Sequence, residues 1–395
     1  MLMDVYHGTR LALSRAKAWA VPYGRRVLRF LALPRYYFFQ VPWAICPASP
    51  LRVASDLGHL FFRLKCYPEG YAKCRLWAVD RSRWPLYYAS LTDPYQRRQL
   101  VKVVQPPEYR VAFADKELCQ HLCHGLGLPL PSFLGCVAPE EDFRAIIRAS
   151  LRQAAHGAVI AKPVRGTAGR GVQVILLEQG EPVVLAGGQR LPLARMALEE
   201  RSILQEVVIQ HPDLAAFHPE SVNTVRVQTL LTRDGEVLIL GSLVRFGRSG
   251  SRVDNMGAGG IGLGVHPEDG RLHSNGWDYR GHRYDRHPET GVVFAGARIP
   301  FWDEVLDLVR SAQAQFGFYR LLGFDVALTP AGPVLIEINP QPDNVSLEAS
   351  CGPILARPGA LQAFARYGLL VNGPAKALAA GERDAEARSQ GLLAS

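Results

Sequence analysis

The chain has 395 residues, 48% of them hydrophobic, and a mean hydropathy near zero. This composition is typical of a soluble globular protein with a core large enough for two or three lobes. No apolar run reaches the roughly 18 residues that a membrane-spanning helix needs, and the N-terminus has an acid where a signal peptide has positive charge. We therefore expect no transmembrane segment and a cytoplasmic location.

Positive charge is concentrated in the first part of the chain. Residues 1–110 hold 18 Lys and Arg against 6 Asp and Glu, whereas the remainder holds 27 against 30. Such a segment can meet nucleic acid, a membrane surface or an acidic partner, or it can be a solvated face. We expect it to pack on the rest of the protein and to bind no specific nucleic acid.

The first hundred residues are expected to be a mostly helical, basic region. A helix is predicted near residues 10–20 and another over 55–65. Two prolines divide the aromatic segment 30–43 into a helix, an elbow and a packing segment.

Residues 101–210 are expected to form one lobe of an α+β fold. A helix over 115–127 is capped by Asp115 and ended by Gly125 and Gly127. The other elements predicted by periodicity and turn residues are a strand at 132–137, a helix at 140–154, strands at 158–163 and 172–177, a helix at 193–201 and a strand at 202–208.

Residues 211–372 are expected to form a second, strand-rich lobe, followed by an Ala-rich tail at 373–395. Strands at 224–232 and 237–245 should form a hairpin that turns at Asp234-Gly235. The other predicted elements are a polar, glycine-rich loop at 248–264, a helix at 300–316, strands at 323–328 and 334–338, and a closing helix at 358–370.

The seven cysteines form no CxxC pair, and no His/Cys cluster has the spacing of a zinc site. Their odd number and scatter weakly favour a reducing compartment. They are Cys46, Cys66, Cys74, Cys119, Cys123, Cys136 and Cys351.

A strand ending at Lys162 leads into the glycine-rich run 165–171. The glycines let the backbone approach an anion and direct N–H groups at it, and Lys162 would add a positive charge to phosphates. The run is not a P-loop, because it lacks GK[ST] and a strand follows it. A plain turn is the alternative interpretation.

The hairpin over residues 321–343 carries three oxygen ligands. If its turn centres on Ala331, Asp325 lies opposite Glu337, and Asn339 shares the face of Glu337 because side chains alternate along a strand. These three side chains would suit Mg²⁺, which prefers hard oxygen ligands. The alternative is a hairpin whose acids face water, but a lone buried carboxylate is costly.

These features occur together, in order, in a known family. The chain resembles the ATP-grasp superfamily, and most closely the sugar-transfer-associated ATP-grasp proteins, from about residue 100 to 370. The group usually has a shorter acidic motif ending in Gly-Asn, whereas Glu337-Ile338-Asn339-Pro340 is closer to the wider superfamily. The matching stretches are Asp115-Lys116 and residues 161–172, 204–214, 220–231, 243–262 and 323–343.

The resemblance implies an ATP site between two α+β lobes, with a role for each matching position. Adenine would hydrogen-bond the backbone of Glu206 and Val208, and Asp213 would reach the ribose. The phosphates would be bound by Lys116, Lys162 and the loop containing Gly166, Thr167, Gly169 and Gly171. Two Mg²⁺ ions, replaceable by Mn²⁺, would be held by Asp325, Glu337 and Asn339.

The resemblance also implies a chemistry. In ligases of this superfamily a carboxylate attacks the γ-phosphate, and an amine or other nucleophile captures the acylphosphate. Arg226 and Arg245, on adjacent predicted strands, fit a cationic clamp on the carboxylate, or else they are surface salt-bridge partners. Asn255, with the glycines that follow it, would form a mobile substrate loop or an ordinary flexible turn.

We therefore expect an ADP-forming ligase that joins a small-molecule carboxylate to an amine or related nucleophile, in a biosynthetic or saccharide-modifying pathway. Two alternatives stay open. One is a kinase that phosphorylates a small-molecule or sugar hydroxyl, and the other is a nucleotide-binding scaffold without turnover. The expected partners are small molecules, and a homodimer is left open.

Overall fold

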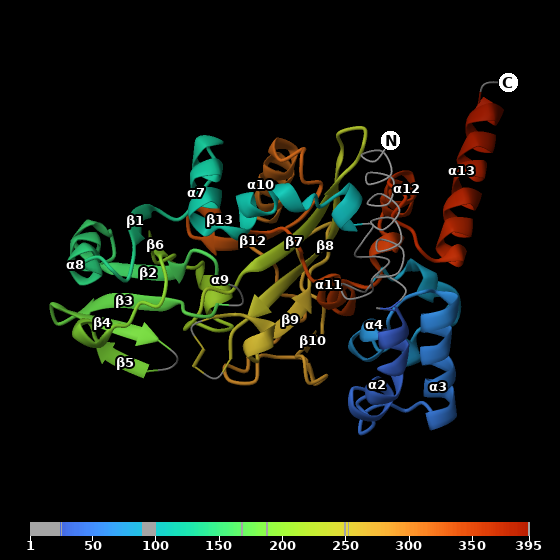
Figure 1. The fold of residues 1–395 in the computed structure, drawn as a ribbon, viewed down its shortest axis with the longest axis horizontal. Helices are drawn as coiled ribbons and strands as arrows, with labels where there is room; N and C mark the ends of the chain where they lie inside the picture. The colour runs from blue at the N-terminus through green and yellow to red at the C-terminus, as the bar shows by residue number, and fades with distance from the viewer. Residues whose placement is uncertain are drawn as a thin grey trace, which may run out of the picture. The chain divides into compact units, whose positions relative to one another are not determined.

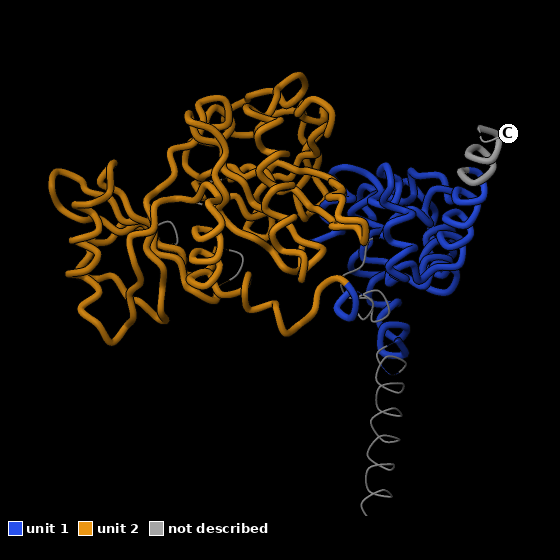
Figure 2. The backbone as a smooth tube through the Cα atoms, turned by 90° about the horizontal axis from the view of Figure 1, so that it is seen from above, with its two compact units in different colours: residues 1–103, 343–395 blue, residues 104–342 orange. Residues whose placement is uncertain are grey.

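A computed structural model of the chain describes residues 24, 26–88, 100–166, 169–186, 189–248, 250, 251 and 253–393, with side chains up to residue 385. The chain forms two compact units (Figure 2). Residues 104–342 form the core unit, and residues 1–103 with 343–395 form the flanking unit. The sequence-based division had placed residues 343–372 with 211–342, whereas here they belong to the flanking unit.

The core unit contains two antiparallel sheets (Figure 1). The first sheet has the order β1-β6-β2-β3-β4-β5. Its strands are β1 Phe133–Val137, β2 Ala158–Pro163, β3 Gln173–Glu178, β4 Glu181–Ala186, β5 Gln189–Pro192 and β6 Ser202–Glu206. Helix α8 (Phe143–Gln153) packs on this sheet through Phe143, Ile147 and Leu151, whose spacing of four places them on one face.

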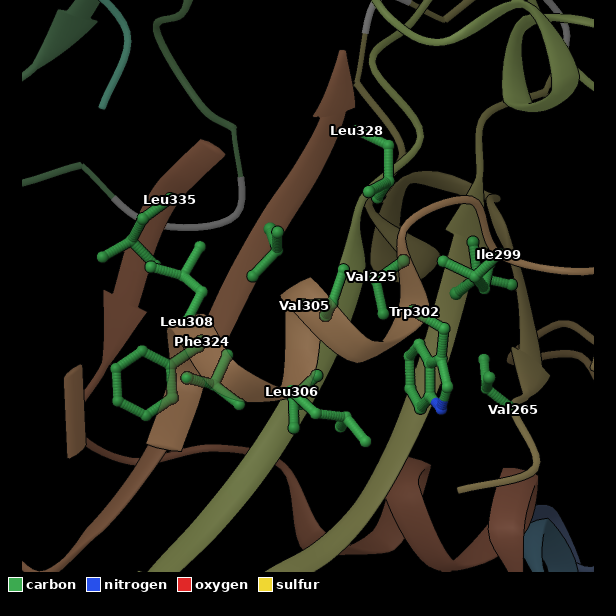
Figure 3. Close-up of a cluster of buried hydrophobic side chains, with 14 of the residues drawn as sticks. Val225, Val265, Ile299, Trp302, Val305, Leu306, Leu308, Phe324, Leu328 and Leu335 are labelled. Carbon is green, nitrogen blue, oxygen red and sulfur yellow. The ribbon is translucent and has the colours of Figure 1, made fainter. Parts of the chain in front are cut away.

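The second sheet has the order β11-β10-β9-β8-β7-β12-β13. Its strands are β7 Val225–Leu231, β8 Val237–Phe246, β9 Ile261–Gly264, β10 Gly276–Trp277, β11 Arg283–Tyr284, β12 Leu321–Thr329 and β13 Gly332–Asn339. Helix α10 (Trp302–Gln315) covers it, and Trp302, Val305 and Leu306 pack among Val225 and Phe324 of the sheet and Val265, which follows β9 (Figure 3). Both predicted hairpins, β7–β8 and β12–β13, are present.

The remaining described helices of the core unit are short, apart from α7. They are the 3-10 turn Pro107–Tyr109, α6 Val111–Ala114, α7 Lys116–Gly125, the 3-10 turn Leu193–Arg195, α9 Pro212–Ala215 and the 3-10 turn Met256–Ala258. As predicted, Asp115 caps α7 by accepting a hydrogen bond from the N–H of Leu118.

Two local predictions were wrong. The helix expected over 193–201 is a single 3-10 turn, because Met196 is buried in the core of the first sheet and the chain must then extend to reach β6. Here packing overrides a favourable helix propensity. The loop expected over 248–264 also contains strand β9, which pairs with β8.

The flanking unit is helical, as expected. Its elements are α2 Leu33–Phe39, α3 Pro50–Gly58, the π-helical turn His59–Arg63, α4 Glu69–Lys73, the 3-10 turns Leu76–Ala78 and Arg81–Leu86, α11 Asn344–Cys351, the 3-10 turn Ile354–Ala356, α12 Ala360–Arg366 and α13 Gly373–Leu393. Its core is rich in aromatic rings, with Tyr36, Tyr71, Trp77 and Trp84 among the buried residues. The helix predicted near residues 10–20 lies outside the described residues.

The structure bears on two further expectations. Within the described part of the chain, every helix is too short or too polar to cross a lipid bilayer. All seven cysteines are free thiols.

Glu348 in α11 predicts how the stability of the flanking unit depends on pH. Its Oε1 accepts the backbone N–H groups of Tyr88 and Ile354, and the residue is 2% exposed. Burial raises its pKa from 4.5 to about 8 despite those two donors. Between these values the folded chain holds a proton that the unfolded chain releases. Stability should therefore fall as pH rises from about 5 to 8, by at most ~1.4 kcal/mol per unit.

Urea denaturation at several pH values measures this effect. Glu348→Gln should flatten the profile and raise stability at pH 8 to 9, whereas Glu382→Gln, at an exposed acid of the same unit, should not. A Glu348→Gln profile that follows the parent's would contradict the prediction.

Candidate functional site

A small, partly open cavity lies between elements of the two sheets of the core unit. Its polar lining is made by Lys116 and Gln120 from α7, Lys162 from β2, Gln205 from β6 and Glu337 from β13. Its apolar lining comes from Phe113, Cys119, Cys123, Leu130, Ile203, Leu335, Ile336 and Ile338. Three residues predicted from the sequence to bind phosphate or metal therefore share one cavity: Lys116, Lys162 and Glu337.

Lys162 is held by a short chain of side-chain hydrogen bonds. Because β2 and β6 run antiparallel with Ile160 opposite Gln205, the ammonium of Lys162 reaches the side-chain oxygen of Gln205 at 2.8 Å. Gln205 in turn donates to the side-chain oxygen of Gln120, also at 2.8 Å. Burial lowers the pKa of Lys162 to about 8; the Glu337 carboxylate opposes this shift and the Lys116 ammonium adds to it. Within the described part of the chain, the cavity thus holds a lysine whose hydrogen-bond partner, Gln205, is neutral.

Lys116 connects the start of α7 to the glycine-rich run. Its backbone N–H donates to the carbonyl of Val164 at 3.0 Å, and its ammonium donates to the carbonyl of Gly166. Gly171 has a φ of +72°, and a Cβ there would lie 2.8 Å from the ring of Pro163, so only glycine fits. Gly169 is also left-handed, with a φ of +71°. Thr167 lies outside the described residues.

The acidic hairpin has the predicted register. Asp325 on β12 lies directly opposite Glu337 on β13, and Asn339 donates through Nδ2 to Oδ2 of Asp325 at 3.3 Å. A β-bulge follows Asp325, since Val326 pairs with Leu335. Like charges directly opposite each other repel, so the two acids need positive charge beside them.

Two arginines from neighbouring strands supply positive charge to Asp325. Arg226 binds both carboxylate oxygens at 2.6 Å, and Arg245 reaches Oδ2 at 2.9 Å. The Asp325 side chain is 3% exposed. Burial works to raise its pKa, but the two guanidinium groups outweigh burial and hold the pKa at about 2.

The two arginines have an acid of the protein itself between them. They converge as predicted, since Arg226 lies opposite Leu243, two residues from Arg245. The anion between them, however, is Asp325. The arginines are therefore salt-bridged, but in the interior and not at the surface, and a clamp on a substrate carboxylate stays a prediction.

A second acid extends the ionic network. Asp254 is buried and accepts hydrogen bonds from both the N–H and the hydroxyl of Thr224, and its Oδ2 lies 3.5 Å from Nε of Arg245. The Thr224 hydroxyl also accepts from Arg245. Asp254 thereby fastens the glycine-rich segment after β8 to the start of β7.

The other predicted residues lie outside the cavity lining. The backbone N–H of Glu206 donates to the carbonyl of Ser132 at 3.0 Å, and the contact of Glu206 and Val208 with adenine stays a prediction. The Asp213 side chain is 71% exposed and lies 3.7 Å from His211. The Asn255 side chain accepts from the N–H of Gly257 at 2.7 Å, which is the geometry of a local turn.

Four further residues of the site were not predicted from the sequence: Gln120, Gln205, Thr224 and Asp254. Gln120 follows Lys116 by four residues, and that helical spacing places both on one face of α7. Gln205 is adjacent to the predicted Glu206 and points to the other face of the same strand. Asp254 and Thr224 give no signal of their own, because only the fold brings them together.

Comparison with known proteins agrees with these motifs. The sequence profile of the family described as sugar-transfer associated ATP-grasp matches residues 95–357. A comparison with curated proteins found no match.

Similar solved structures include N5-carboxyaminoimidazole ribonucleotide synthetase from Thermotoga maritima, with 14% identity and a TM-score of 0.36 over 65% of this chain and 52% of that one. D-alanyl-alanine synthetase A from Vibrio cholerae has 13% identity and a TM-score of 0.40 over 67% of each chain. The ATP-grasp ligase PsnB, complexed with minimal precursor, Mg and ADP, has 17% identity and a TM-score of 0.34 over 64% of this chain and 59% of that one. The chain thus spans little more than half the length of the first and third of these structures.

The profile match covers most of the chain and includes the cavity, the glycine-rich run and the acidic hairpin. The protein belongs to the sugar-transfer associated ATP-grasp family.

Proposed function

We propose that the core unit binds ATP in the cavity between its sheets and that the protein is an ATP-dependent ligase. The observation that carries this proposal is the convergence of Lys116, Lys162 and Glu337, from three separate elements, on one largely apolar cavity. Two ammonium groups suit a polyphosphate, and the apolar lining suits an adenine ring.

The acidic hairpin also offers a donor set that fits Mg²⁺. Glu337 and the amide oxygen of Asn339 are hard ligands. Oδ2 of Asp325 already accepts from Arg226, Arg245 and Asn339, whereas Oδ1 accepts from Arg226, so Oδ1 is the oxygen that Asp325 could offer. When bound, Mg²⁺ would neutralise charge on the transferring phosphate.

The proposed reaction forms ADP and an acylphosphate. An oxygen of the substrate carboxylate attacks the γ-phosphorus as ADP leaves, and an amine or related nucleophile then attacks the acyl carbon as phosphate leaves. In this proposal Lys116, Lys162 and the glycine-rich run hold the phosphates in line. The pathway is biosynthetic or saccharide-modifying.

Direct phosphorylation of a hydroxyl is the second candidate, and one observation favours it. The arginine pair expected to hold a substrate carboxylate already makes ion pairs with Asp325 and Asp254. A kinase needs the phosphate-binding groups but no carboxylate clamp.

A screen of carboxylates crossed with amines and hydroxyl compounds, read by ADP release, tests these candidates. A ligase releases free phosphate only when acid and nucleophile are both present, whereas a kinase leaves the phosphate on its acceptor. A chain that binds no ATP at all would contradict both.

Glu337→Gln should give a folded protein that turns over at least about 100-fold more slowly at ordinary Mg²⁺ concentration. The amide removes the one carboxylate that lines the cavity, while the ion pair of Asp325 with Arg226 remains. Turnover against Mg²⁺ concentration is the measurement. Glu304→Gln, at an exposed acid in the first turn of α10, is the matched control. Full activity of Glu337→Gln at the same Mg²⁺ concentration would contradict the metal assignment.

A further inference from the structure

A second group of metal-binding side chains lies in the core unit, outside the cavity. It consists of His218, His287 and Glu289, and one candidate ligand atom from each lies within 4.8 Å of the others. His218 follows α9, whereas His287 and Glu289 lie in a tight loop after β11, in which the N–H of Gly291 donates to the carbonyl of His287. Sequence spacing gives no zinc signal here, because the two histidines are distant along the chain.

Backbone carbonyls fix the tautomer of both imidazole rings. Nε2 of His218 lies 3.1 Å from the carbonyl oxygen of Ser251, and Nε2 of His287 lies 2.9 Å from that of Gly247. A carbonyl only accepts hydrogen bonds, so each Nε2 carries the proton and donates it. In the neutral rings each Nδ1 therefore has a free lone pair, as metal-binding histidines with a backbone partner do.

The three facing groups are all acceptors. Among the described residues, Nδ1 of His287 has no hydrogen-bond partner, although the residue is 0% exposed. Nδ1 of His218 faces Oε2 of Glu289 at 3.7 Å. Two imidazole nitrogens with lone pairs and a carboxylate oxygen, all within 4.8 Å of one another, are donor atoms that a metal cation takes. A proton on His218 would pair with Glu289 but would leave Nδ1 of His287 unsatisfied.

The surrounding contacts hold this geometry in place. The hydroxyl of Thr290 donates to the carbonyl of Phe217 at 3.0 Å, which ties the loop of Glu289 to the segment of His218. The carbonyl of His218 accepts from the side chain of Asn223 at 2.8 Å. A Cβ on Gly247 would lie 2.5 Å from the His218 ring, so the close approach of that backbone requires glycine. The ligands are thus positioned before any ion binds.

We propose that His218, His287 and Glu289 bind one transition-metal dication of the zinc class, with water as the fourth ligand. Two imidazole nitrogens and one carboxylate are a zinc donor set that leaves one position open. The Glu289 side chain is 37% exposed, so water reaches that position. Gly247 and Ser251 closely follow the strand that carries Arg245. The ion would hold their backbone in place through the two histidine rings. This site is independent of the ATP proposal.

The test uses the untagged full chain, stripped with a chelator and then dialysed with Zn²⁺ or Co²⁺ in excess Mg²⁺, which occupies hard oxygen sites. We expect one zinc per chain by elemental analysis, the visible absorption of four-coordinate Co²⁺, and a melting temperature that zinc raises. Glu289→Gln and His287→Gln should each weaken zinc affinity by at least about 10- to 100-fold and abolish the zinc-dependent melting shift.

Controls separate this site from other zinc-binding groups. His266 and His273 form a second histidine pair, with ring centroids 4.4 Å apart, so His266→Gln and His273→Gln test for adventitious surface binding. Both should leave zinc affinity unchanged, as should Glu337→Gln. If His287→Gln does not fold, the zinc affinity of Glu289→Gln tests the site, because Glu289 is the partly exposed ligand. Failure of the parent chain to retain zinc, or equal affinity in Glu289→Gln, would overturn the site.

Discussion

Lys162→Ala should weaken ATP binding by about 10- to 100-fold and nearly abolish turnover. The ammonium of Lys162 lies in the cavity and, among the described residues, its hydrogen-bond partner is the neutral side chain of Gln205, so it can meet a phosphate. A charge-assisted contact of this kind contributes about 1.5–3 kcal/mol to binding. Isothermal titration with ATP and a steady-state rate measure both effects, and equal affinity and rate would remove the assignment of the site.

The same variant should be more stable than its parent in the absence of nucleotide. Burial holds the pKa of Lys162 near 8, below its ordinary 10.5, so charging this lysine costs the folded state free energy at pH 7. That cost is present below pH 8 and disappears as pH rises toward 10.5. ATP affinity of the parent should correspondingly fall above pH 8, where the free protein loses the Lys162 proton. Lys162→Arg, which stays charged, should not show this decline.

Arg226→Met should lower the free energy of unfolding by about 3–5 kcal/mol, the cost of breaking a buried ion pair. The Arg226 side chain is 17% exposed and makes a two-pronged contact with the nearly inaccessible Asp325. Removing it leaves that carboxylate with one guanidinium, that of Arg245, and the amide of Asn339. The double variant Arg226→Met/Asp325→Asn should lose less stability than the sum of the two single variants, because neither charge is then left unpaired.

Arg226→Lys separates a catalytic role from a structural one. Lysine keeps the charge but loses the bidentate fork. If Arg226 also contacts the group being transferred, turnover per folded molecule should fall strongly while ATP affinity barely changes. A lower melting temperature with normal turnover would show that the arginine serves only the ion pair. Melting temperature, ATP affinity and rate should be measured on one sample.

The sequence predicted the features that depend on local pattern. The register of Asp325 against Glu337 followed from alternation and a short turn, and the hairpin that turns at Asp234-Gly235 correctly put Arg226 and Arg245 on adjacent strands. The cap at Asp115 followed from helix-start chemistry.

What the sequence could not predict depends on contacts between distant segments. The partner of the arginine pair was expected to be a ligand, because alternation does not show that Asp325 also faces Arg226 on its other side. The segment 196–201 has helix-forming residues, but the burial of Met196 keeps it extended. The zinc-class cluster has no motif, since the loop of His287 and the segment of His218 meet only in the folded unit.

The charged residues on β7, β12 and β13 form a row across the sheet, because Arg226 lies opposite Asp325 and Asp325 lies opposite Glu337. If one of these strands shifted by one residue, its charged side chain would turn to the opposite, apolar face of the sheet. The charged side chain on the neighbouring strand would then be buried without a partner. Each shifted pairing would therefore be penalised by several kcal/mol. The row of charged residues therefore favours the native register of these three strands during folding, independently of any part it has in catalysis.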